Sequence, residues 1–161
     1  MIERSAPVQV LYVEDDPSDA KLTLRTLRKE GLANQIHHVT DGEQALDYLF
    51  CRGTYAHREV DQLPQLVLLD INLPRIDGIE VLRQVRSDLR MSSLPVVLLT
   101  SSRLEIDILA GYELHANSYI VKPVDFQKFA ESVTLLGMYW MLHNVSPVRP
   151  AATQPGGELV T

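Results

Sequence analysis

Four apolar runs in this sequence end at polar residues whose side chains could take part in chemistry. These residues are Glu14 and Asp15 after the first run, then Asp70, Thr100 and Lys122 after later ones. Each alone has an ordinary explanation, such as an acidic group at the start of a helix or a solvated loop lysine. A carboxylate beside a buried run is costly without a partner, however, and all five residues are hard to explain separately. We therefore treat them as one candidate site.

The types of these side chains point to phosphoryl transfer assisted by a divalent cation. Three carboxylates repel one another unless a cation joins them, and a ligand set made only of oxygens suits Mg²⁺. Asn72 follows Asp70 by two residues, so its backbone carbonyl could supply a further oxygen. With the metal bound, Asp70 could act as a nucleophile and form an aspartyl-phosphate. Lys122 would add positive charge, and the Thr100 hydroxyl could donate to a phosphoryl oxygen.

The elements that would position these residues alternate between strands and helices. Short apolar runs predict strands at 8–13, 36–39, 66–69, 96–99 and 119–121. Helical spacing of apolar residues predicts a helix after each strand, and Asp16 with Pro17 and Asp125 are clear helix starts. Because the strands are apolar throughout, we expect an α/β fold with a parallel sheet covered by helices on both faces. Such sheets place their sites at the carboxyl ends of the strands, where the polar residues should meet.

The same residues make the chain resemble a known family, the receiver domains of two-component response regulators. The motifs that carry the resemblance are Glu14-Asp15, LLDINLP at 68–74, Asp77-Gly78, Thr100-Ser101 and Lys122-Pro123. The resemblance covers roughly residues 8–142 and extends to the intervals between the motifs. It implies a doubly wound, flavodoxin-like fold with five parallel strands in the order 2-1-3-4-5.

The resemblance also implies a role for each site residue and a partner. By it, Asp70 accepts a phosphoryl group from a sensor histidine kinase, and Glu14 and Asp15 form the acidic pair at Mg²⁺. Lys122 would bind the phosphate, Thr100 would be the switch hydroxyl, and Tyr119 occupies the family's aromatic switch position. Such a protein transmits a signal and is not a turnover enzyme.

A narrower resemblance is to the small single-domain regulators paired with bacterial phytochromes. It is carried by LPRIDG at 73–78, YIVKPVDF at 119–126, GMYW at 137–140 and the long segment 51–64. It implies a kinase of the phytochrome type. Segment 51–64 shows no clear period, and because a loop of that length is uncommon inside a compact domain, we treat it as a candidate functional segment. His115 departs from the pattern, since many relatives have glycine after the fourth helix.

Composition narrows the class of protein and its partners. We expect a receiver domain at 1–144 and a flexible Pro/Gly-rich tail at 145–161, with output through an unknown downstream partner. The net charge of -6 and scattered basic residues speak against nucleic acid. No apolar stretch approaches the length of a membrane span, and the single cysteine fits a reducing compartment. We therefore expect a cytoplasmic protein without a membrane partner.

Two other classes share part of this pattern. Phosphohydrolases of the haloacid-dehalogenase type also use an Asp nucleophile after a strand, but they need a second acid two residues later, where this chain has Asn72. A flavin- or nucleotide-binding module would need a glycine-rich phosphate loop, and neither common form occurs. A metal site at His37 and His38 is disfavoured because adjacent strand residues point to opposite faces.

The last helix suggests self-association. From Phe126 onward, one apolar stripe reaching Trp140 should face the sheet, and a second stripe lies on another side. The second stripe comprises Leu135, Met138, Tyr139 and Leu142. A helix apolar on two sides needs a second covering surface, so we expect a homodimer. The alternatives are that segment 51–64, the tail or the kinase covers the second stripe.

Overall fold

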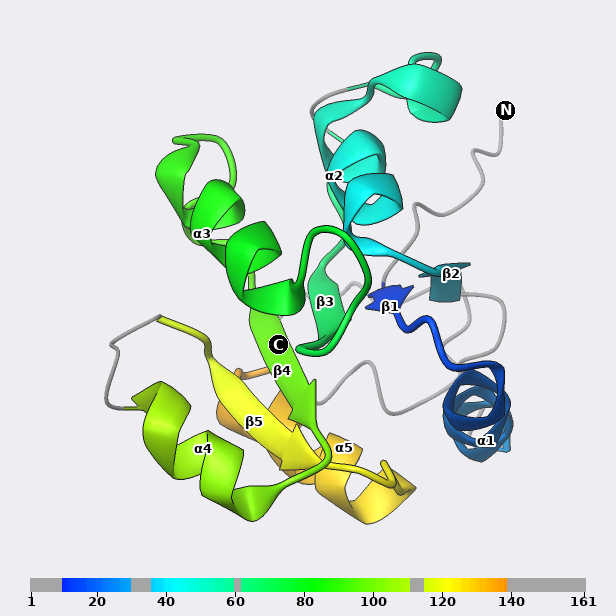
Figure 1. Cartoon of the computed structure of the whole chain (residues 1–161), viewed down its shortest axis with the longest axis vertical. Coiled ribbons are helices and arrows are strands. Elements are labelled where there is room, and N and C mark those ends of the chain that lie inside the picture. Colours follow the sequence, from blue (N-terminus) through cyan, green and yellow to red (C-terminus); the bar gives the residue numbers. More distant parts are fainter. Residues whose placement is uncertain (1–9, 30–35, 60–61, 111–114, 139–161) are drawn as a thin grey trace, which may run out of the picture.

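The core of the fold is one parallel sheet (Figure 1). A computed structural model describes residues 10–29, 36–59, 62–110 and 115–138 of the chain. Its strands are β1 (Val10–Val13), β2 (Ile36–Val39), β3 (Leu66–Asp70), β4 (Val96–Thr100) and β5 (Ser118–Val121). They lie in the order β2-β1-β3-β4-β5, and every neighbouring pair is parallel. The predicted α/β fold and strand order are confirmed.

A helix follows each strand and begins close to the strand's carboxyl end. The helices are α1 (Pro17–Arg28), α2 (Gly42–Phe50), α3 (Gly78–Ser87), α4 (Arg103–Ala110) and α5 (Phe126–Leu135). Asp16, Asp41, Asp77 and Asp125 cap α1, α2, α3 and α5 by accepting backbone N–H groups. No helix in the described ranges is long and apolar enough to cross a membrane.

Two apolar layers pack on opposite faces of the sheet. Leu11 and Val13 belong to the layer under α2 and α3, whereas Val10 and Tyr12 belong to the layer shared with α1 and α5 (Figure 1). This alternation follows from the two-residue period of a strand, and β1 is buried on both faces. Because helices cover both faces, a functional site on this sheet can be accessible only at the strand ends.

His37 and His38 lie on opposite faces of β2, as expected. His38 stacks on Tyr12 with ring centroids 5.2 Å apart, and its Nε2 contacts the carbonyl of Glu14 at 2.9 Å. His37 instead stacks on Tyr48, with centroids 4.5 Å apart. Their different neighbours prevent the two rings from sharing one metal ion.

The described part of segment 51–64 contains regular structure, although its sequence shows no period. It contains the short 3-10 helix η2 (Gly53–Tyr55). The Tyr55 hydroxyl lies 3.0 Å from His37 Nε2, and the Arg58 guanidinium lies 3.7 Å from the centre of the Tyr48 ring. The described part of this segment therefore packs against α2 and β2.

The expectation of one long final helix is wrong. α5 ends at Leu135, and Gly137 takes a left-handed conformation with φ +74°. The N–H of Met138 donates to Val133 at 2.7 Å and that of Gly137 to Thr134 at 3.0 Å, the paired bonds of a Schellman turn. Glycine tolerates this conformation, so the apolar spacing does not continue the helix past it.

The predicted second stripe changes accordingly. Leu135 is 80% exposed, but Met138 packs against the core layer that contains Val133. Tyr139 and Leu142 lie outside the described residues, as do Trp140 and the tail. Of the two described residues of the stripe, Leu135 is largely exposed and Met138 is partly buried.

Candidate functional site

Three carboxylates meet at the carboxyl ends of β1 and β3. Glu14 and Asp15 follow β1, and Asp70 ends β3. One carboxylate oxygen from each lies within 4.8 Å of the other two. Glu14 is 1% and Asp70 2% exposed, whereas Asp15 is exposed. The cluster thus has a buried floor and one side open to solvent.

Lys122 reaches this cluster from the end of β5. Its Nζ lies 3.1 Å from Glu14 Oε1 and 3.4 Å from Asp70 Oδ2. Its backbone N–H donates to the Thr100 carbonyl at 2.8 Å, and the bond from Lys122 to Pro123 is cis. The structure therefore brings the predicted lysine to the predicted carboxylates.

Asp19 is a member of the site that the sequence analysis missed. Its Oδ2 lies 2.9 Å from Lys122 Nζ, nearer than either Glu14 or Asp70. Asp19 stands in the first turn of α1, one turn beyond the Asp16 cap. This position could have identified Asp19 from the sequence, because the first turn of a helix that begins at a strand end lies at the same edge of the sheet as the site.

Burial controls the charge of the cluster. It raises the pKa of Glu14 to about 8, and a hydrogen bond and repulsion from Asp70 add to the rise. Burial also raises the pKa of Asp70. Burial alone would lower the pKa of Lys122, but the surrounding carboxylates, Asp19 first among them, outweigh it and raise that pKa. The carboxylates thus resist ionisation even with the lysine beside them.

These residues fit a divalent cation. The donors are all oxygens, and hard cations such as Mg²⁺ and Mn²⁺ prefer such ligands. A cation would also relieve the repulsion that raises the pKa of Glu14. The backbone N–H of Asn72 donates to Asp70 Oδ1 at 3.4 Å, which places Asn72 next to the cluster. The acidic cluster can therefore bind a divalent metal.

The loop from β3 to α3 is held by an ion pair that the sequence analysis did not find. Arg75 has φ +64°, and its Nη2 lies 2.8 Å from Oδ2 of the buried Asp41, the cap of α2. Gly78 closes the loop by donating to the Ile71 carbonyl at 2.9 Å. These contacts anchor the segment that carries Asn72.

Thr100 lies beside the cluster, but its hydroxyl is engaged elsewhere. The residue is fully buried at the end of β4, and Leu99 pairs with Asp70 across the sheet. Its Oγ1 donates to the Glu105 carboxylate in the first turn of α4. Glu105 also went unrecognised in the sequence.

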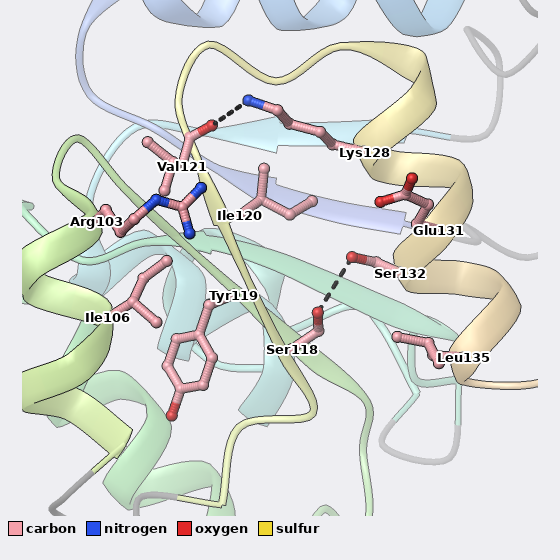
Figure 2. A pocket seen from close by; sticks show the side chains of 10 residues that line it. All are labelled: Arg103, Ile106, Ser118, Tyr119, Ile120, Val121, Lys128, Glu131, Ser132 and Leu135. Carbon is pink, nitrogen blue, oxygen red and sulfur yellow. Dashed lines mark hydrogen bonds between the residues drawn. The ribbon is translucent and has the colours of Figure 1, made fainter.

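Tyr119 lies away from the carboxylates, on β5. Figure 2 shows its ring beside Ile106 of α4, with side chains of α5 on the other side of the pocket. The pocket has a volume of about 250 Å³. The ring packs against the core layer of α2 and α3, and burial raises the pKa of its hydroxyl. Tyr119 thus lies on the α4 side of β5, at a pocket that both α4 and α5 border.

Comparison with known proteins agrees with this arrangement. The chain is 37% identical over 147 residues to the probable methanogenesis regulatory protein FilR2 of Methanothrix harundinacea, covering 91% of this chain and 92% of that one. The solved bacteriophytochrome response regulator AtBRR is 44% identical, with TM-score 0.79, over 84% of this chain and 96% of its own. The Mn²⁺-bound form of response regulator Rcp1 is 31% identical, with TM-score 0.62, over 93% of this chain and 100% of its own. A family model described as the response regulator receiver domain matches residues 10–134, so the chain belongs to this family of phosphorelay signalling proteins.

Proposed function

We propose that this chain is a response regulator that accepts a phosphoryl group on Asp70 from a sensor histidine kinase. The observation that carries the proposal is the buried Asp70 carboxylate, with Lys122 Nζ 3.4 Å away and two further carboxylates beside it. The Lys122 ammonium group and a metal ion bound by the carboxylates would both neutralise the phosphoryl oxygens. The Asp70 carboxylate is therefore suited to attack phosphorus. In the transfer, an Asp70 oxygen bonds to phosphorus while the bond from phosphorus to the donor nitrogen breaks.

Each neighbouring residue has a part in this transfer. Mg²⁺, held by Glu14, Asp15, Asp70 and the backbone carbonyl of Asn72, would supply positive charge for the phosphoryl oxygens. The Mn²⁺-bound form of Rcp1 supports a divalent metal in a related protein. Lys122 neutralises a phosphoryl oxygen, and the Thr100 hydroxyl donates to another. Tyr119 then follows Thr100 and alters the surface of α4, β5 and α5 (Figure 2).

The proposed partner is a kinase of the phytochrome type, and the proposed setting is the cytoplasm. Support comes from the likeness to bacteriophytochrome response regulators. We propose phosphoryl acceptance with slow loss of the group in place of enzymatic turnover, because Asn72 cannot serve as an acid or base two residues after Asp70. The net charge of -6 favours protein partners over nucleic acid.

The test is phosphotransfer to the wild-type chain. A phosphorylated phytochrome-type kinase, or acetyl phosphate with Mg²⁺, should add one phosphoryl group, and mapping of peptides by mass spectrometry should place it on Asp70. Chelation of the metal with EDTA should prevent the labelling. Label on another residue, or none from either donor, would refute the proposal.

We also propose that the chain forms a homodimer through α4 and the end of α5. Leu104 and Ile108 on α4 and Leu135 on α5 are exposed large apolar side chains, and the two helices border the pocket beside Tyr119. Apolar side chains on adjoining elements favour an interface. Because this surface lies beside Tyr119, phosphorylation could alter the association of two copies of the chain. The alternative is that the kinase binds the same surface.

Sedimentation of the full chain tests the dimer. The wild type should sediment as a dimer at micromolar concentration, and Leu135→Glu should convert it to a folded monomer because a buried charge opposes association. Leu89→Glu is the matched control, since Leu89 is 94% exposed and lies between α3 and β4. A wild type that remains monomeric with and without beryllofluoride would exclude this interface.

A further inference from the structure

The hydrogen bond between Thr100 and Glu105 joins the end of β4 to the first turn of α4. The Thr100 side chain is fully buried, and its hydroxyl donates to the Glu105 carboxylate. The Ser102 carbonyl is a more distant acceptor at 3.3 Å, and the Ser102 N–H donates to Thr100 Oγ1 at 3.2 Å. A bond to a carboxylate is stronger than one to a neutral carbonyl, so Glu105 is the main partner of this hydroxyl.

Glu105 is held in place by the start of α4. Its backbone N–H donates to the Ser102 carbonyl at 3.1 Å, and the N–H of Leu104 donates to Ser102 Oγ at 3.1 Å. A carboxylate in the first turn of a helix is also favoured by the helix dipole. The acceptor of the Thr100 hydroxyl is therefore attached to a helix that borders the surface beside Tyr119.

The Thr100 hydroxyl has one hydrogen to donate. Its two possible acceptors are the Glu105 carboxylate and a phosphoryl oxygen on Asp70. In the unphosphorylated chain the hydrogen goes to Glu105. A phosphoryl group on Asp70 would need the same hydrogen directed toward β3, because Asp70 pairs with Leu99, the residue before Thr100. The two bonds exclude one another.

From this competition we propose that Glu105 is a positioning residue that holds the Thr100 hydroxyl away from Asp70 until phosphorylation. The inference rests on the proposed function of Asp70 and Thr100. Part of the energy of phosphate binding is then used to break the bond to Glu105. Once Thr100 turns, the first turn of α4 loses this hydrogen bond to the end of β4, which links the site to the outer surface.

The test compares the affinity for beryllofluoride, a mimic of the phosphoryl group, in the presence of saturating Mg²⁺. Glu105→Gln keeps the size of the side chain but replaces a charged acceptor with a weaker neutral one. The dissociation constant should fall by roughly three- to ten-fold relative to the wild type. Glu131→Gln, an exposed change on α5, is the matched control and should leave it unchanged.

A double-mutant cycle separates positioning from a general effect of charge. In the Thr100→Val background there is no hydroxyl to release, so adding Glu105→Gln should produce no further gain. The affinity for Mg²⁺ alone should be the same in Glu105→Gln and the wild type. An equal gain in both backgrounds, or no gain in either, would overturn the role of Glu105. Failure of the wild type itself to bind beryllofluoride would instead refute the proposed function.

Discussion

Acetyl phosphate with Mg²⁺ is expected to label the wild-type chain and to leave Asp70→Asn unlabelled. The amide has nearly the same shape as the carboxylate but lacks the anionic oxygen that attacks phosphorus. Glu14 is also buried beside Lys122, but it follows β1, so its carboxylate does not take the place of the Asp70 carboxylate at the end of β3. Intact-mass spectrometry after a fixed incubation measures the outcome, and labelling is expected to fall to background.

Asp16→Asn is the matched control, since it makes the same chemical change near the site. Asp16 is exposed and caps α1, and asparagine caps helices as well as aspartate, so labelling should persist. Undiminished labelling of Asp70→Asn would mean that another residue is the acceptor.

The Asp70→Asn variant should also be more stable than the wild type without metal. Burial raises the pKa of Asp70 and Glu14 in the folded chain, so each carboxyl adds stability only while protonated. That stability is lost as the pH rises through the folded pKa, which for Glu14 is about 8. Removing one of the two charges should raise the melting temperature at pH values above neutrality. A lower melting temperature than that of the wild type would contradict the repulsion between Asp70 and Glu14.

Gly78→Ala is expected to destabilise the fold by about 3 kcal/mol, because it overpacks the end of β3. A Cβ at this position would lie 2.3 Å from the Asp70 carbonyl oxygen and 2.8 Å from Ile71 Cα. Both are backbone atoms, which cannot move aside as a flexible side chain does. Alanine is otherwise preferred over glycine inside a helix by about 1 kcal/mol, so helix propensity alone predicts the opposite sign. Urea denaturation gives the free energy of unfolding.

Gly137→Ala is a suitable comparison for this change. Gly137 has φ +74°, and a Cβ there meets no atom of the described residues within 4 Å, so alanine introduces backbone strain without a clash among them. That strain costs about 1 to 2 kcal/mol. Gly78→Ala should therefore be the more damaging variant, and it should also weaken labelling because Asp70 itself must shift. Stability equal to the wild type would show that the loop from β3 to α3 yields without cost.

The sequence by itself determined the alternation of strands and helices and the residues at the strand ends. Asp16 and Asp125 were recognisable as caps because capping involves groups only a few positions apart in the chain. Uniformly apolar strands implied a sheet covered on both faces, and parallel strands in such a sheet end at one edge. Glu14, Asp15, Asp70 and Lys122 therefore converge as predicted.

The end of α5 shows where two local signals compete. Apolar spacing continues beyond Leu135, but Gly137 carries the signal for a helix end, and the structure follows the glycine. The bond from Met138 to Val133 turns the chain and directs Met138 back to the core. Spacing alone could not decide this, because apolar residues after a turn can contact the same core as those before it.

Only the tertiary structure decided which partners the site residues have. Asp19 reaches Lys122 and Arg75 reaches Asp41 across long separations in the chain, and no period or motif encodes such pairs. Glu105 is only five residues from Thr100, yet their bond depends on how α4 packs beside β4. A hydrogen bond needs its two atoms placed within a fraction of an ångström, and packing of the whole domain sets that placement.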